Sequence, residues 1–278
     1  MIGSLQTGVS GLQQFQEYLQ VIGNNIANVN TVGYKSASMD FEDQLSQNLA
    51  NGSSNSMQIG EGVATAAISS DYSQGTINST STPTDLAISG DGFFLVKDTS
   101  SGLTYATRDG EFKLDNNGYM ITANGDRVQG LMGASTTPTD LQINNLTAAA
   151  ALKDTTTPAP TLQTYSINSS GQISATLSDG TTGIIGQFVL QDFTNPQALV
   201  KQGGNLYSFD ADAGPLATPG TPNSAGLGKI QSSALESSNV DLATQMAILI
   251  TAQRAFEANA KMITTSDEIL QDLVNLKR

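Results

Sequence analysis

The feature that most constrains this chain is an apolar heptad pattern in residues 238–277. No Pro or Gly occurs between Lys229 and Arg278. Apolar side chains recur there at alternating spacings of three and four residues, at Leu242, Met246, Leu249, Phe256, Ile263 and Leu270. This spacing is typical of a helix that packs along another helix. A helix of this length, roughly 60 Å at about 1.5 Å per residue, is not stable in water with one apolar stripe, so we expect a partner.

The opposite end of the chain has the same pattern. Its apolar row consists of Leu5, Leu12, Phe15, Leu19, Ile22 and Ile26. The spacing alone is equally compatible with two ordinary amphipathic helices packed on a globular core. Chain termini usually fray unless something holds them, and both of these termini are apolar. We therefore predict a terminal coiled coil whose remaining apolar faces are covered by other copies of the same chain.

Polar residues indicate where both helices begin and end. The sequence Ser238-Asn239-Val240-Asp241 fits a capping box at the start of the C-terminal helix. Asn24 and Asn25 are poor residues for a helix interior. The following segment, 27–35, contains Gly33, which adopts left-handed backbone geometry freely. We therefore predict that the N-terminal helix stops in this segment.

The middle of the chain is predicted to be β structure. Short apolar runs alternate with turn sequences about every ten residues, among them Asp109-Gly110, Asn116-Asn117-Gly118 and Asn124-Gly125. This pattern favours an antiparallel sheet or barrel over alternating strands and helices. The predicted fold class is α+β, with terminal helices around a mostly antiparallel β domain.

The predicted domain plan follows from these elements. Residues 1–30 and 238–278 form the helical coiled-coil domain, 31–70 a connector with an extended or loop segment, and 71–237 the β-rich domain. A Thr/Pro-rich interval at 134–164 interrupts the β domain and suits a linker, a glycan stalk or the remnant of an insertion.

Composition excludes several classes of function. The chain has 12 Lys and Arg against 25 Asp and Glu, a formal net charge of −13, with no basic cluster. This balance argues against a nucleic-acid partner. No run of residues is long and apolar enough for a membrane span, and the N-terminus lacks the pattern of a cleaved leader. Without Cys or His there is no usual zinc site, thiolate nucleophile or imidazole base.

The remaining candidates for chemistry are weak. Gly90-Asp91-Gly92 precedes a predicted strand and lacks the pattern of a phosphate loop. Asp109, Glu111 and Asp115 could form a glycosidase carboxylate set, but Asp is favoured beside turns for backbone reasons, and we prefer turn chemistry. Arg108 is expected in a surface ion pair or a subunit contact. We predict no catalytic residue, cofactor or metal.

Several motifs resemble one known family, the bacterial flagellar axial proteins of the rod and hook group. They are the segments 21–28, 31–35, 72–75, 85–94, 107–110, 234–241 and 250–260, which occur in the family's order along nearly the whole chain. The single residues that carry the resemblance are Asn24, Asn25, Asn28, Gly33, Asp85, Gly90, Gly92, Phe93, Arg108, Asp109, Gly110, Asn239, Gln253 and Arg254.

The resemblance implies a non-enzymatic structural subunit of a helical tube. The chain is most similar to a short hook protein, which implies a flexible universal joint that transmits torque; a distal rod protein is the alternative. Implied partners are other copies of the chain, flagellar rod proteins, the hook cap, the hook–filament junction proteins and the type III export apparatus, without membrane insertion. The implied location is the flagellum outside the cell, reached without a cleaved leader. Outside this family, a monomeric adhesin and a secreted carboxylate-dependent enzyme are the competing classes.

Overall fold

A computed structural model describes residues 2–48, 58–133, 135, 137–144, 161–216, 219–224 and 226–276. The chain divides into two compact units. The helical unit comprises Met1–Val29, Lys35–Asp71 and Val240–Arg278, and the β unit comprises Asn30–Tyr34 and Tyr72–Asn239. The centre of the predicted connector and most of the Thr/Pro-rich interval lie outside the described residues.

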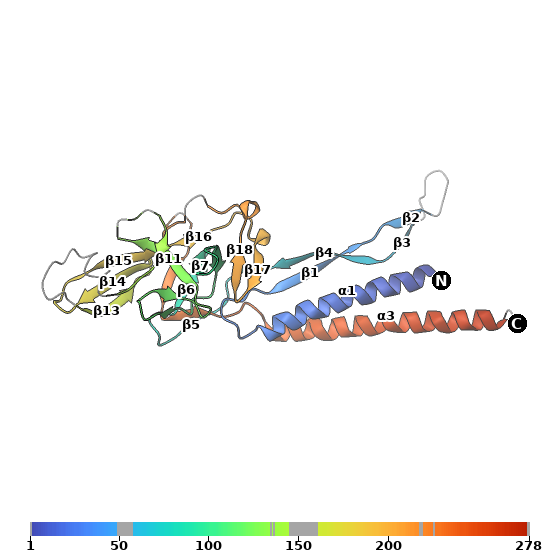
Figure 1. Ribbon diagram of the computed structural model, residues 1–278. Helices are drawn as coiled ribbons and strands as arrows, with labels where there is room; N and C mark the ends of the chain where they lie inside the picture. The colour runs from blue at the N-terminus through green and yellow to red at the C-terminus, as the bar shows by residue number, and fades with distance from the viewer. Residues whose placement is uncertain are drawn as a thin grey trace. The chain divides into compact units, whose positions relative to one another are not determined.

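The helical unit contains two long helices that lie side by side (Figure 1). They are α1, Ile2–Ala27, and α3, Leu242–Leu276. They run antiparallel, because Gly8 lies against Ile263 whereas the Asn25 amide bonds to Gln245 at the other end. The two predicted helices are thus present, and a coiled-coil geometry between them stays a prediction.

The cap of α3 differs from the prediction. The helix begins at Leu242, and Asp241 is its cap: Asp241 Oδ1 accepts from the Ala243 amide at 3.1 Å and Oδ2 from the Thr244 hydroxyl at 2.5 Å. These bonds lower the pKa of the Asp241 carboxyl. The predicted start of the helix at Ser238 is therefore wrong by three residues. Hydrogen bonds from the Asn239 side chain to Ser73 keep this segment outside the helix.

The rest of the helical unit is a β ribbon that packs on α1. Strand β1, Ala37–Asp43, pairs antiparallel with β4, Val63–Ser70, and β2, Ser46–Asn48, pairs with β3, Gln58–Gly60. The Phe41 ring lies 5.6 Å from the Phe15 ring of α1. Thr65 in β4 donates a hydrogen bond to Glu17 of α1 at 3.0 Å. These contacts join the ribbon to the helix.

The β unit is built on one large sheet in which every pair is antiparallel, as predicted (Figure 1). Its main strand order is β13-β14-β15-β11-β7-β8-β18-β17. These strands span Leu162–Ile167, Gln172–Leu177, Thr182–Phe188, Arg127–Met132, Phe93–Lys97, Thr104–Thr107, Leu206–Ser208 and Val200–Gly203. Four short strands pair beside this path: β9 Lys113–Leu114, β10 Met120–Ile121, β12 Thr139–Asp140 and β16 Leu190–Gln191.

Two smaller pairs complete the β unit. They are β6, Leu86–Ser89, with β19, Lys229–Ser232, and β5, Ile77–Ser79, with β20, Ala234–Glu236. Two short 3-10 helices, Pro196–Ala198 and Ala211–Ala213, lie between strands. The pairs bring the end of the β unit's sequence back beside its beginning, which is what assembles the site described below.

Both hydrophobic cores of the described chain lie within the β unit. The larger one surrounds Phe94, Phe112 and Phe188, with the first two rings 5.1 Å apart edge to face. The smaller one contains Phe93, Phe193 and Tyr207, among others. The β unit therefore has the buried apolar side chains that a stable domain needs.

One predicted hairpin turn is not a hairpin. Strand β8, which precedes Asp109-Gly110, pairs with β7 and β18 and not with the strand that follows the dipeptide. Gly110 instead lies against β6, where the Leu86 amide donates to the Gly110 carbonyl at 3.0 Å. The turn prediction used local sequence only, whereas a contact between distant strands decides this conformation.

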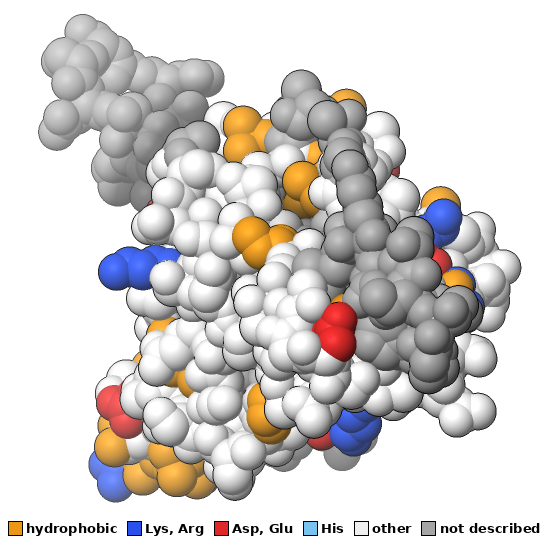
Figure 2. All heavy atoms as spheres, turned by 90° about the vertical axis from the view of Figure 1, so that its left-hand side faces the viewer, with side chains coloured by type: hydrophobic (Ala, Val, Ile, Leu, Met, Phe, Trp, Pro, Cys, Tyr) orange, Lys and Arg blue, Asp and Glu red, His pale blue; other side chains and the backbone are white. Residues whose placement is uncertain are grey.

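The described surface carries few charges. On the face seen in Figure 2, Lys, Arg, Asp and Glu side chains are scattered, and backbone and uncharged polar groups cover most of the area. This agrees with a sequence in which only 13% of residues are charged. None of the described helices has a stretch of the length and hydropathy required to span a membrane.

Candidate functional site

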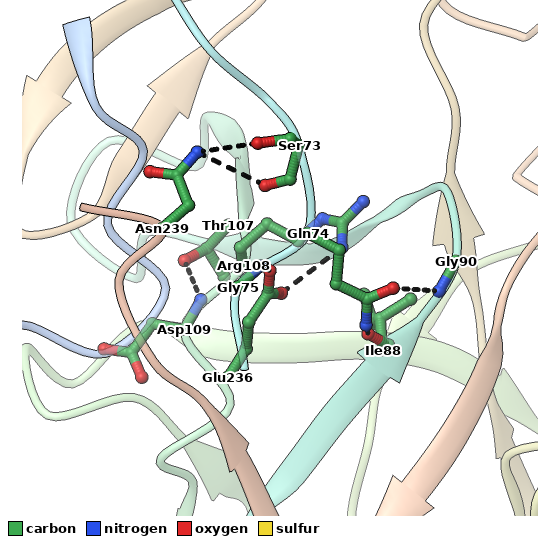
Figure 3. A network of polar contacts seen from close by, with 10 residues as sticks. All are labelled: Ser73, Gln74, Gly75, Ile88, Gly90, Thr107, Arg108, Asp109, Glu236 and Asn239. Carbon is green, nitrogen blue, oxygen red and sulfur yellow. Dashed lines mark hydrogen bonds and ion pairs between the residues drawn. The ribbon is translucent and has the colours of Figure 1, made fainter. Parts of the chain in front are cut away.

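Three of the predicted family residues, Gly33, Arg108 and Asn239, lie where the chain enters and leaves the β unit. We call this site the clasp, defined as the segments 30–34, 72–76 and 236–239 together with Arg108. Every crossing of the chain between the two units begins or ends in one of these three segments. Hydrogen bonds within the β unit tie the three segments to one another, and Figure 3 shows side chains of 72–76 and 236–239 that take part.

The centre of the clasp is a buried ion pair. Arg108 Nη1 lies 3.3 Å from Glu236 Oε2, and the two side chains are 4% and 1% exposed. The guanidinium also lies 5.0 Å from the centre of the Phe93 ring. The other Glu236 oxygen accepts a hydrogen bond from the Gly75 amide at 2.9 Å. The expected ion pair of Arg108 is therefore present, but its predicted place on the surface is wrong, because Glu236 and the Phe93 ring lie against the guanidinium in the interior. A subunit contact of Arg108 stays a prediction.

Gly33 lets the first segment approach Arg108. Its amide donates to the Glu236 carbonyl at 2.8 Å. Its φ is +67°, and a Cβ there would lie 2.7 Å from the Arg108 carbonyl carbon. Both the left-handed backbone and the close approach require glycine. The predicted left-handed geometry of Gly33 is confirmed, and Asn205 adds a hydrogen bond to the Val32 carbonyl at 2.9 Å.

Asn239 joins the last segment to the other two. Its side-chain amide donates to the Ser73 hydroxyl at 3.1 Å, and its backbone amide to the Tyr34 carbonyl at 3.4 Å. Gln74, beside Ser73, extends the network to the sheet: it donates to the Ile88 carbonyl at 2.9 Å and accepts from the Gly90 amide at 3.1 Å. The three segments are thus fixed to the β unit as well as to each other.

The carboxylates next to the clasp hold a turn. Asp109 accepts a hydrogen bond from the Glu111 amide at 3.0 Å, and its own amide donates to the Thr107 hydroxyl at 3.0 Å. Asp85 forms an isolated antiparallel bridge with Glu111. Burial raises the pKa of the Asp109 carboxyl above its ordinary value. Our preference for turn chemistry over a catalytic carboxylate set agrees with these bonds.

This raised pKa predicts a pH dependence. Because the fold disfavours the ionised Asp109 carboxyl relative to the unfolded chain, the free energy of unfolding should fall as the pH rises through and above the ordinary carboxyl range. Asp109→Asn removes that contribution and keeps an oxygen for the Glu111 amide. We expect the variant to gain thermal stability relative to wild type between pH 4 and pH 7, measured by circular dichroism melting. Asp109→Ala, which loses the turn bond as well, is the control and should be less stable than Asp109→Asn at both pH values.

The other predicted glycines and Phe93 are structural parts of the β unit. Gly92 has a φ of +120° and lies against Leu190 and Leu227. Gly90 has a φ of +114°. Phe93 belongs to the smaller hydrophobic core and stacks on Arg108. These residues connect the clasp to the core.

Asn25 is the structural centre of the helical unit. It is 1% exposed, its side-chain amide donates to the Ala37 carbonyl at 2.8 Å, and its oxygen accepts from the Ala37 amide at 2.9 Å. The same amide lies 3.3 Å from Gln245 Oε1 in α3. Asn25 therefore fixes α1, α3 and the start of the ribbon together. Asn28 bonds back to Asn24 at 2.8 Å.

Removal of this amide should release the ribbon. In Asn25→Ala the Ala37 amide loses its acceptor and the Ala37 carbonyl loses its donor. This destabilises the folded state by about 1–3 kcal/mol if the two groups stay buried. We expect the Ala37 amide to exchange with deuterium at least tenfold faster than in wild type, measured by hydrogen-exchange NMR or mass spectrometry. Asn24→Ala, at the neighbouring exposed position, is the matched control. Unchanged protection of Ala37 would contradict this role of Asn25.

Most side chains of the two predicted apolar rows are only partly buried in this chain. Ile22 is buried, and the half-buried members are Leu5, Leu12, Phe15, Leu19, Ile26, Leu249, Phe256, Ile263 and Leu270. Leu242 and Met246 are 44% and 41% exposed. The family residues Gln253 and Arg254 are exposed on α3. Their role in assembly stays a prediction.

Two groups of residues that form contacts in the structure were not predicted from the sequence. On α3 the side toward α1 also contains Gln245, Ala252, Asn259 and Ser266, spaced by seven residues. In the clasp, Glu236 was not predicted as a site residue, although it is the only charged residue between Lys229 and Asp241. A lone charge in an uncharged segment could have indicated a buried partner.

The described residues also contain no group of three or more Asp or Glu arranged to hold a metal ion. The clasp consists of a buried ion pair, backbone hydrogen bonds and tightly packed glycines that hold chain segments together.

Three family models match successive parts of the chain. "Flagella basal body rod protein" matches residues 5–35, "Flagellar hook protein FlgE/F/G D1 domain" matches 87–175, and "Flagellar basal body rod FlgEFG protein C-terminal" matches 231–276. The flagellar basal-body rod protein FlgG of Bacillus subtilis is 42% identical over 287 aligned positions that cover 100% of both chains. The chain belongs to the flagellar rod and hook family. Each of the three matched segments supplies part of the clasp: Gly33, Arg108 and Glu236 respectively.

Two further relatives represent both branches of this family. The basal-body rod protein FlgG of Borreliella burgdorferi is 34% identical over 288 positions, covering 100% of both chains. The hook protein FlgE of the same organism is 26% identical over 444 positions, again covering 100% of both chains. The chain is accordingly a structural, axial subunit of the flagellum, and this family implies self-assembly with other flagellar components.

Proposed function

We propose that this protein is a subunit of the flagellar rod, of the distal, drive-shaft type, and not of the hook. The observation that carries the proposal is the end-to-end match to rod proteins. The Bacillus subtilis rod protein aligns over 287 positions, barely more than the 278 residues of this chain. The hook protein needs 444 positions, so it contains long insertions that this chain lacks. The initial expectation of a short hook protein has weaker support than its alternative.

The architecture supports a torque-bearing subunit. In our proposal the helical unit packs with the helical units of other copies to form the tube, and the β unit forms a layer outside it. The clasp fixes the three segments through which force must pass between the units. A buried ion pair and glycine contacts too close for any side chain make such a joint resistant to deformation.

We also propose the route and the partners of the subunit. It leaves the cell interior through the flagellar type III export apparatus as an unfolded chain. It then assembles onto other rod proteins and carries the hook at its outer end. A chain without cysteine suits passage through an export channel and assembly outside the cytoplasm, because no thiol must be protected.

Deletion of the gene in the source bacterium tests the proposal. We expect electron micrographs of isolated basal bodies to show a truncated rod without a hook, and expression of the wild-type chain to restore the full structure. A complete rod that ends at the outer surface without a hook would overturn the rod assignment in favour of the hook. An intact flagellum in the deletion strain would overturn both the rod and the hook assignment.

A further inference from the structure

The last two strands of the β unit close it against its first two. We call residues 229–236, which contain β19 and β20, the strap. β19 pairs with β6, and β20 pairs with β5. Among the described strands, β6 has no other partner than β19, and β5 has none other than β20. The first two strands of the β unit therefore stay unpaired until the end of its sequence reaches them.

Strand β6 lies in the interior of the β unit. Leu86 and Ala87 are 0% exposed, and Ile88 is 1% exposed. Leu86 and Ile88 both belong to the larger hydrophobic core. The register places every residue of β6 opposite a residue of the strap. Without the strap, β6 would expose these core side chains to water and lose the partners of its backbone groups on that side, which strongly destabilises a folded state.

The strap also contacts both hydrophobic cores. Ile230 is 2% exposed and belongs to the larger one. Glu236 forms the buried ion pair with Arg108, whose guanidinium lies on the Phe93 ring of the smaller core. An open strap would leave this guanidinium in the interior without its carboxylate, which is strongly unfavourable. Neither core is complete without the strap, so the strap and the sheet should form in one cooperative step.

A strained residue joins the two strands of the strap. Ser233, between β19 and β20, has a φ of +55°, and among the described residues it is the only one with a positive φ that is neither glycine nor asparagine. Such a backbone is unfavourable for other residues and persists only where the surrounding structure fixes it. Here the Ser233 carbonyl accepts from the Thr80 amide at 2.7 Å. The strap is therefore stable only with both of its partner strands in place.

From these contacts we infer that the strap is a folding checkpoint. The β unit folds only when residues 229–236 are free to join β5 and β6, and a shorter portion of the chain stays unfolded. For a chain that passes through a channel with its amino terminus first, the strap leaves after the rest of the β unit. The part already outside therefore cannot fold early and hold the remainder in the channel. This consequence rests on the proposed export, whereas the checkpoint itself is a property of the fold.

The ribosome offers a test, because the chain emerges from its tunnel with the amino terminus first. An arrest sequence inserted at successive positions from residue 224 onward stalls synthesis with the strap inside or outside the tunnel, and folding outside pulls the arrest free. We expect the fraction of released chains to stay at background while the strap is inside. It should rise at least fivefold once residue 239 is outside. The same rise with the strap still inside would overturn the inference.

Two substitutions on opposite faces of β19 are the matched controls. Ile230→Asp places a carboxylate in the larger core, so the strap cannot close and the rise should vanish. Gln231→Asp makes the same kind of change at the exposed neighbouring position and should keep at least half of the rise. A rise of unchanged size in Ile230→Asp would show that folding does not need the strap.

A second measurement uses the folded full-length chain. Ser233→Gly relieves the left-handed strain and leaves the backbone bonds of the strap in place. We expect amide hydrogen exchange to slow at least threefold, by the same factor at Ile230 and Ala234 of the strap as in β7 and β11 of the main sheet, because all exchange through one opening. Ser233→Val, whose branched side chain disfavours this backbone more, should speed both groups at least tenfold. Changes confined to the strap would mean that it opens from an intact sheet, which would overturn the checkpoint and leave the rod assignment untouched.

Discussion

Replacement of Arg108 by Met should destabilise the protein by about 3–5 kcal/mol at pH 7, because it leaves the Glu236 carboxylate buried without its cation. For a domain of this size that corresponds to a fall in melting temperature of roughly 10 °C. Met keeps the contact with the Phe93 ring, so the loss measures the missing charge more than missing volume. Differential scanning calorimetry of the purified chain gives the change directly.

A second substitution separates this effect from a packing defect, because it removes the charge that Arg108→Met leaves buried without a cation. The double variant Arg108→Met, Glu236→Gln should regain more than half of the lost stability, since Gln still accepts from the Gly75 amide. The control is Lys113→Met, which breaks the exposed 3.2 Å pair with Glu111 and should cost less than about 1 kcal/mol. An Arg108→Met protein no less stable than Lys113→Met would show that the buried pair does not hold the clasp together.

The order of helix, sheet and helix could be predicted from sequence because each element has its own period. Heptad spacing at the ends and short apolar runs between Gly and Asn turns are local patterns, and α1, α3 and the antiparallel sheet follow from them. The left-handed backbone of Gly33 could also be predicted from local sequence, since few other residues tolerate that conformation.

The clasp could not be predicted in the same way. Arg108 and Glu236 are separated by 128 positions in the chain, and nothing in either neighbourhood specifies the other. Only the pairing of β5 with β20 and of β6 with β19 brings the end of the β unit back to its start. A basic residue next to a turn sequence is usually exposed, which is why Arg108 was expected on the surface.

The side of α3 that faces α1 also depends on tertiary packing. The predicted apolar row reaches α1 at Ile263, where a Cβ on Gly8 would lie 3.1 Å from Ile263 Cγ1. The polar residues Gln245 and Asn259 contact α1 as well, since a Cβ at Gly11 would lie 3.0 Å from Asn259 Nδ2 and Gln245 accepts from Asn25. Leu242 and Met246, at the start of the same apolar row, are exposed.

The steric fit of Gly110 gives the second large effect that we expect. A Cβ on Gly110 would lie 1.6 Å from the Leu86 carbonyl oxygen, so Gly110→Ala forces two backbone segments apart. The same movement breaks the hydrogen bond from the Leu86 amide to the Gly110 carbonyl and shifts Leu86, a fully buried residue of the larger core. Together these effects should cost about 3 kcal/mol or more, since a backbone obstruction cannot relax by a change of rotamer.

The matched control for Gly110→Ala is Gly23→Ala in α1, where nothing lies within 4 Å of the added Cβ. Alanine there should be neutral or stabilise the helix by roughly 0.5–1 kcal/mol. Chemical denaturation of the two variants beside wild type should therefore move the midpoints in opposite directions. Equal midpoints for Gly110→Ala and wild type would mean that segment 107–110 does not lie against β6 in solution. The clasp would then lose one of the contacts that hold Arg108, whose carbonyl carbon lies against Gly33 while the nearby Gly110 lies against Leu86.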